Sequence, residues 1–273
     1  FFIALLIFWL PFLEVAGSNP PFSSYSQSSS CFPIRNDSVD YRPVSFSYQK
    51  PQAEKLNFRN FIVPSALISY GFVPRYTGLK HFDESIRDEV QRHMSTDTWV
   101  DDILWVTPFA GVYGLDLLGV KAKHNFKDRV IVTGSSVIIG VGLIELTSHI
   151  TNRWRPDGSE KKSFPSTHTG LSFIGAHLLM KEYSHVSPWI GVAGYGVATL
   201  TGFLRMTNNK HWFSDVVGGA GFGILSVELS YLLLPYLSRT FTFGNKHKKE
   251  AYNSLNIAPA VSENHIGFGL QYA

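Results

Sequence analysis

The chain has 273 residues, of which 44% are hydrophobic and 16% are charged, and its formal net charge at pH 7 is +3. This length is sufficient for one sizeable core with extensions, and the mild charge indicates no polyanionic partner such as nucleic acid. With Cys31 as its single cysteine, the sequence excludes a disulfide within these residues.

The first residues of the chain have the composition of an export signal. Residues 1–13 are almost unbroken apolar, and Val15, Ala16 and Gly17 are small enough to precede a cleavage site. This pattern predicts a signal peptide over residues 1–17, with an uncleaved membrane anchor as the alternative. The following residues are rich in serine, proline, asparagine and tyrosine, which predicts an extended linker over residues 18–57.

Residues 58–240 have the pattern of a helical domain. Apolar or amphipathic stretches recur along it, over residues 61–72, 82–93, 103–120, 130–144, 169–180, 187–204 and 216–238. The pattern predicts an all-α fold, a helical bundle of about five to six core helices. The tail over residues 241–273 alternates loosely towards its end, which predicts short strands there.

Three short polar runs fall at the ends of these predicted helices. They are Arg155-Pro156, the run Pro165-Ser166-Thr167-His168, and the spaced set Arg205, His211 and Asp215. Residues four apart lie on one face of a helix. Asp215 can therefore accept the proton from one ring nitrogen of His211 and leave the lone pair of the other nitrogen free.

Such a histidine is a nucleophile toward phosphorus, and the chemistry predicts a phosphohistidine intermediate. His168 would be protonated and would supply the proton to the departing oxygen. Since both histidines take part in different protonation states, we expect a bell-shaped pH profile.

The remaining polar groups of the three runs suit the oxygens of a phosphate. Arg155 and Arg205 offer planar forks that match non-bridging oxygens. Backbone N–H groups near Ser166 and Thr167, at the start of a helix, attract anions. Because these groups carry the charge, the predicted chemistry needs no metal and no cofactor. The ten histidines also show no zinc-ligand spacing.

The three runs resemble the signature motifs of the type 2 phosphatidic acid phosphatase family, which includes bacterial acid phosphatases and vanadium haloperoxidases. The family pattern is K-x6-R-P, then P-S-G-H, then S-R-x5-H-x3-D. The resemblance implies that His211 is the nucleophile, Asp215 its orienting partner and His168 the acid. It also implies a phosphate cradle, made of Arg155, Arg205, Ser166 and Thr167.

The sequence departs from the family pattern at three positions. Ser148 stands where the family has lysine, Thr167 replaces a glycine, and Leu204 replaces a serine. Losing one charge-assisted hydrogen bond costs about 1.5–3 kcal/mol, or roughly 10- to 150-fold in rate or affinity. Threonine is acceptable at position 167 if the residue lies in the first turn of a helix, but not if the backbone needs a positive φ.

The run from Arg155 to Ser159 is most similar to lipid phosphatases of the envelope of Gram-negative bacteria. The resemblance implies a metal-independent phosphatase that hydrolyses a phosphomonoester or pyrophosphate of an envelope lipid. Its partners would be the phosphorylated lipid and the membrane. It would be exported, and either associated with the inner membrane or periplasmic, with its site facing the periplasm.

Several alternatives stay open. The chain could be a weakened relative that binds lipid phosphates, a soluble periplasmic acid phosphatase or a vanadate-dependent oxidant enzyme. A membrane span needs about 20 apolar residues, which only residues 187–204 and 216–238 approach. A soluble bundle with apolar core helices is therefore the alternative to membrane embedding, which the family resemblance favours.

Overall fold

The computed structural model describes residues 57–76, 80–240, 255–262 and 265–272. The predicted signal peptide and, except for its last residue, the predicted linker lie outside these residues. The described helices are α2 (Arg59–Tyr76), α3 (Lys80–Met94), α4 (Val100–Leu104), α5 (Thr107–Leu117), α6 (Phe126–Thr151), α7 (Thr167–Tyr183), α8 (Pro188–Thr207) and α9 (Phe213–Thr240). The predicted all-α bundle is confirmed.

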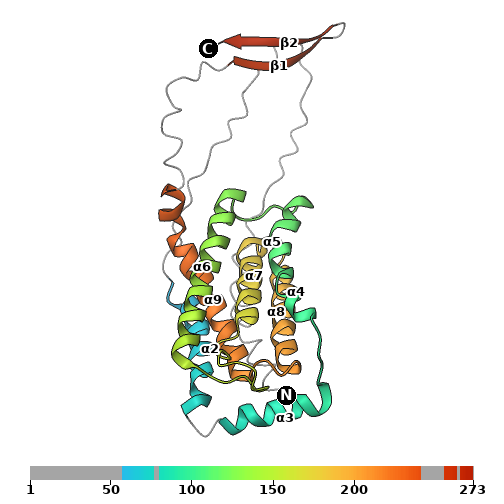
Figure 1. Ribbon diagram of the computed structural model, residues 1–273. Helices are drawn as coiled ribbons and strands as arrows, with labels where there is room; N and C mark the ends of the chain where they lie inside the picture. Colours follow the sequence, from blue (N-terminus) through green and yellow to red (C-terminus); the bar gives the residue numbers. More distant parts are fainter. Residues whose placement is uncertain (1–56, 77–79, 241–254, 263–264, 273) are drawn as a thin grey trace.

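The bundle is arranged around α7 and α9. Figure 1 shows α5, α6, α7, α8 and α9 running side by side, with α3 across one end. In the tail, β1 (Leu255–Ser262) and β2 (His265–Tyr272) form an antiparallel hairpin in which Leu255 pairs with Tyr272.

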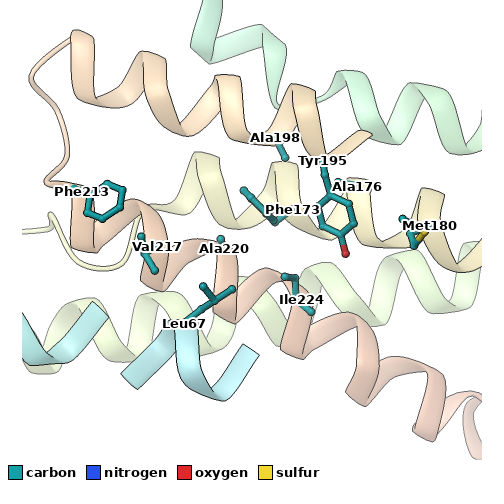
Figure 2. Close-up of a cluster of buried hydrophobic side chains, with 10 residues drawn as sticks. All are labelled: Leu67, Phe173, Ala176, Met180, Tyr195, Ala198, Phe213, Val217, Ala220 and Ile224. Carbon is teal, nitrogen blue, oxygen red and sulfur yellow. The ribbon is translucent and has the colours of Figure 1, made fainter. Parts of the chain in front are cut away.

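The packed interior between α7, α8 and α9 consists of apolar side chains. Figure 2 shows Phe173, Tyr195, Val217 and Ile224 pointing into one cluster, with Leu67 of α2 closing it from the other side. Burying each large apolar side chain stabilises the fold by about 1.5–3 kcal/mol. This core holds the ends of α7 and α9 in a fixed relation.

At one end, α7 and α9 touch through their main chains. The N–H group of Ser166 donates to the carbonyl of Asp215 at 3.0 Å. A Cβ atom added to Gly219 would lie only 2.5 Å from the carbonyl oxygen of Ser166. Only a glycine at position 219 therefore permits this approach.

Local sequence explains why the helices stop where they do. The side chain of Asn125 caps α6 by accepting from the N–H of Asp128 at 2.9 Å. At its other end α6 stops at Thr151, and the next residue, Asn152, has a positive φ of 45°. Asn209, just after α8, has a positive φ of 57°. Asparagine tolerates this left-handed conformation better than most residues. Both turns direct the chain into loops at the same end of the bundle.

Two described helices, α6 and α9, are long and apolar enough to cross a membrane by length and composition alone. Most of the apolar window in α9 is buried inside the bundle, as in the core of a soluble protein, whereas only 22% of that in α6 is buried. Of the two stretches that the sequence analysis named, residues 216–238 lie in α9, whereas residues 187–204 lie in α8, which is not one of these two helices. Helix α6 was missed because it continues beyond Glu145 to Thr151.

A candidate active site at one end of the bundle

His211 lies just before α9, and its ring is held by the main chain. Its Nδ1 is 2.7 Å from the carbonyl oxygen of Ser163. A carbonyl can only accept, so Nδ1 carries the proton and Nε2 keeps its lone pair. Asp215 Oδ2 is 3.8 Å from the same Nδ1, which is too far for a hydrogen bond. The predicted partner Asp215 is thus near the ring, but the hydrogen bond that orients it comes from Ser163.

Asp215 is instead the centre of its own hydrogen-bond network. It accepts from the hydroxyl of Ser163, from the N–H of Trp212 at 2.8 Å and from Arg153 Nη1 at 2.8 Å. Asp215 and Ser163 therefore form one unit that contacts the main chain of Trp212 and the ring of His211. His211 precedes α9, so it does not share a helix face with Asp215 as predicted; the Asp215 carboxylate lies 3.8 Å from the ring, and the ring donates to Ser163 instead.

Arg153 connects this unit to α3. Its Nη2 donates to Asp83 at 2.8 Å, while Nη1 also donates to the hydroxyl of Ser214 at 2.7 Å. Asp83 is fully buried and accepts from the N–H of Ser214 at 3.1 Å and from its hydroxyl. Both carboxylates that Arg153 contacts, Asp83 and Asp215, are buried, so Arg153 balances their charge.

His168 lies in the first turn of α7, close to Arg205 of α8. His168 Nε2 is 3.3 Å from Asp102 Oδ1, and the same oxygen is 3.4 Å from Arg205 Nη1. Arg205 Nη1 also donates to Asp101 Oδ2 at 2.6 Å. The short helix α4 therefore places an acidic pair, Asp101 and Asp102, against two residues that the sequence assigned to phosphate chemistry.

The loop between α6 and α7 carries the second predicted arginine. Arg155 Nη2 forms an ion pair with Glu160 at 3.1 Å, and no hydrogen-bond partner of its Nε is found among the described residues. The loop is tied to the segment before His211 because Lys210 donates to Asp157 at 2.8 Å. Burial raises the pKa of Asp157, but hydrogen bonds from Lys210 and Ser159 outweigh it and lower the value to about 2.

Thr167 lies at the start of α7, where its backbone conformation is helical. Ser166 has the extended backbone of an N-cap residue, and Thr167 is the first residue of the helix, without a positive φ. Threonine is therefore acceptable there, and the N–H groups of the first turn have no partner within the helix. The N–H of Ser166 already donates to Asp215, so the prediction that it binds phosphate does not fit this arrangement.

Ser148, at the family's lysine position, is buried in α6. Its hydroxyl has no hydrogen-bond partner among the described residues. Three cations follow in the loop after α6 and could replace that lysine: Arg153, Lys161 and Lys162. Arg153 contacts Asp83 and Asp215, while Lys161 Nζ lies 5.0 Å from the ring centre of Trp154. Lys162 is exposed. The missing lysine is therefore not replaced by Arg153.

Burial and neighbouring charges lower the pKa of both histidines. For His168 burial is the largest cause, the positive charge of Arg205 adds to it, and Asp102 partly opposes it; the pKa falls to about 4. Burial also lowers the pKa of His211, although Asp215 acts in the opposite direction. A neutral His211 is the form that a nucleophile requires.

The sequence pattern did not reveal four acidic or hydroxyl side chains of this site. They are Asp83, Asp101, Asp102 and Ser163. Among the described residues, no group of three or more histidine, cysteine, aspartate or glutamate side chains is arranged to hold a metal ion.

Comparisons with known proteins agree with the motifs. Residues 129–239 match the family model of the PAP2 superfamily. The chain is 29% identical over 272 residues to a "Lipid A 1-phosphatase" of Porphyromonas gingivalis, a match that covers 97% of this chain and 58% of that protein. The chain thus spans little more than half the length of this curated relative.

Two crystal structures are also similar. LpxE of Aquifex aeolicus is 19% identical with a TM-score of 0.40, over 54% of this chain and 92% of that one. A transmembrane PAP2 type phosphatidylglycerolphosphate phosphatase of Bacillus subtilis is 18% identical with a TM-score of 0.39, over 71% of this chain and 100% of that one.

Proposed function

Since the chain contains a PAP2 superfamily domain over residues 129–239, we propose that it is a phosphoric ester hydrolase acting on a lipid phosphate. The observation that carries the proposal is the hydrogen bond from His211 Nδ1 to the Ser163 carbonyl at 2.7 Å. It fixes the tautomer in which Nε2 has a free lone pair. Burial keeps the imidazole neutral, which is the reactive form.

The first chemical step transfers the phosphoryl group to His211. Nε2 forms a bond to phosphorus, the bond from phosphorus to the lipid oxygen breaks, and that oxygen takes a proton from His168. In the second step His168, now neutral, removes a proton from water. The water oxygen bonds to phosphorus, the bond from phosphorus to Nε2 breaks, and inorganic phosphate leaves.

The negative charge of the transferred group is met by protein groups alone in this proposal. Arg205 and Arg155 are both near His211, because the positive charge of each lowers its pKa. The N–H groups of Thr167 and His168 belong to the first turn of α7, where the helix dipole favours anions. The reaction is therefore proposed to be metal-independent.

We propose an envelope lipid as substrate and a membrane as the location. The curated relative's name specifies lipid A. On α6, Ile138 and Ile150 are 75% and 73% exposed, and exposed apolar side chains on a long apolar helix suit contact with lipid. The site lies at the end of the bundle, where a phosphorylated headgroup can reach it. We propose a bacterial envelope protein whose site faces the periplasm.

The decisive experiment compares histidine variants in phosphate release. The full chain in detergent is tested with a soluble phosphomonoester and with a panel of lipid phosphates. His211→Ala should show no release above background, and His168→Ala should lose about 10²- to 10⁴-fold. His185→Ala is the matched control, because His185 is exposed in the turn after α7. Equal activity in wild type and His211→Ala would refute the mechanism.

The intermediate can be trapped directly. Rapid quenching with substrate carrying labelled phosphate should leave label on the protein in a form that base preserves and acid removes, as expected for a phosphohistidine. Labelling should be absent from His211→Ala and retained by His185→Ala. Chelators should leave both labelling and turnover unchanged; inhibition that added divalent metal reverses would contradict the metal-independent reaction.

One observation favours a second candidate, a weakened protein that binds lipid phosphates. Ser148 supplies no charge where the family has lysine, and Arg205 is already paired with Asp101. A wild-type chain that binds inorganic phosphate but hydrolyses no phosphoester would favour this alternative. Under the enzyme proposal, Ser148→Lys should raise activity by up to about 10- to 150-fold if the new ammonium reaches the phosphate.

A further inference from the structure

The carboxylate of Asp102 lies between His168, the proposed acid, and Arg205, a proposed ligand of the phosphate. One of its oxygens, Oδ1, lies 3.3 Å from His168 Nε2 and 3.4 Å from Arg205 Nη1. A phosphate oxygen that binds Arg205 and faces the proton of His168 would have to lie in the same place. We propose that Asp102 is a tethered competitor of the substrate phosphate, an inference that rests on the phosphate site of the proposed function.

The neighbouring residue Asp101 shows what a permanent partner of Arg205 looks like. Asp101 is 1% exposed, accepts from Arg205 Nη1 at 2.6 Å and accepts from Asn208 Nδ2 at 2.8 Å. These two short contacts hold Arg205 against α4. Removing a buried partner of this kind leaves an uncompensated charge. Asp101 is therefore a positioning residue for Arg205.

Asp102 differs from Asp101 in burial and in the length of its contacts. Its side chain is 59% exposed, and both of its contacts exceed 3.2 Å. Ion pairs of exposed side chains contribute little because water screens them and the side chain loses rotational freedom. Rotation about its side-chain bonds can carry the Asp102 carboxylate into water, while Asp101 keeps α4 in place.

A competitor of this kind weakens the binding of every anion at the site by the same factor. It therefore leaves the choice between substrates unchanged but raises KM and the dissociation constant of inorganic phosphate. The bound phosphate replaces Asp102 as the negative neighbour of His168. Chemistry after binding should consequently not depend on Asp102, so kcat should change little when the carboxylate is removed.

The test measures the dissociation constant of inorganic phosphate by calorimetry, using the full chain in detergent. Asp102→Asn should lower this constant by about 1.4- to 5-fold, the range expected when one ion pair of the exposed Asp102 carboxylate, that with Arg205, is removed. It should lower KM similarly and keep kcat within about twofold. Asp101→Asn is the matched control and should weaken phosphate binding, because Arg205 loses its buried partner.

Two outcomes overturn the inference. The first is unchanged, weaker or undetectable phosphate binding in Asp102→Asn whose thermal unfolding matches wild type. The second is a fall in kcat at constant KM, which would make Asp102 part of proton transfer through His168. If Asp102→Asn misfolds, Asp102→Ser is measured in its place. If Asp102→Asn binds phosphate more tightly but neither it nor wild type hydrolyses any phosphoester, Asp102 is a competitor of phosphate and the proposed hydrolase activity is refuted.

Discussion

Replacing Arg153 with methionine distinguishes a structural cation from a phosphate ligand. Arg153 donates at 2.8 Å to both Asp83 and Asp215, and the two carboxylates are 1% and 0% exposed. Methionine keeps much of the side-chain volume and removes the charge. Breaking a buried ion pair by removing one partner costs about 3–5 kcal/mol, because the remaining charge is left without compensation.

A loss of that size should be visible in thermal unfolding. For a domain of this size, each kcal/mol corresponds to about 2–4 °C, so Arg153→Met should melt roughly 6–20 °C below wild type. Lys162→Met removes an exposed cation from the same loop and should melt within about 2 °C of wild type. Adding Asp83→Asn to Arg153→Met removes one unpaired carboxylate and should restore part of the stability.

The contrary result is equally specific. If Arg153→Met unfolds at the wild-type temperature while its dissociation constant for inorganic phosphate rises tenfold or more, Arg153 binds phosphate directly. The account of Arg153 as the cation that joins α3 to α9 would then be wrong. Combined measurement of unfolding and phosphate binding therefore decides between the two roles.

The remaining predictions concern pH, packing and hydrogen bonding. The pKa of His168 is about 4 in the free site. Because the reaction needs the proton of His168, kcat/KM should fall as pH rises above that value. Bound phosphate offsets the charge of Arg205, so the fall in kcat should occur at a higher pH. A fall in kcat and in kcat/KM at the same pH would contradict this. Gly219→Ala should destabilise the fold and abolish phosphate release, because its Cβ would meet the Ser166 carbonyl. The control Gly142→Ala has open space around the added Cβ and should be neutral or stabilise the fold by up to about 1 kcal/mol in thermal unfolding. Ser163→Ala should cost about 1–3 kcal/mol in the same assay, because buried Asp215 loses a hydroxyl donor; an unchanged melting temperature would show that the hydroxyl contributes nothing.

Much of the fold was predictable because helical periodicity is a local property of the sequence. The apolar stretches predicted the bundle, and the positions of the polar runs predicted that His168, His211 and Asp215 lie at helix ends. The end of α6 was missed because Glu145 interrupts the apolar run, although one acid does not end a helix. The partner of His211 was missed because spacing within a helix does not reveal a backbone carbonyl such as that of Ser163.

The acidic side chains of the site could not be predicted from local pattern. Asp83 lies in a charged, amphipathic stretch that is typical of a surface helix, yet it is buried against Ser214. Asp101 and Asp102 meet Arg205 across more than 100 residues of sequence. A single sequence contains no signal for contacts over that separation, so only the folded chain brings these residues together.

The glycine contact between α7 and α9 has a consequence for how such proteins diverge. The separation between His168 on one helix and His211 before the other is set where main chain meets main chain, at Ser166 and Gly219. No series of small side-chain changes can adjust that separation, because the smallest possible step is already a collision. Under the proposed function, adjustment to a different substrate is therefore left to the loop from Asn152 to Pro165 and to α4, whose side chains can change without moving the two helices.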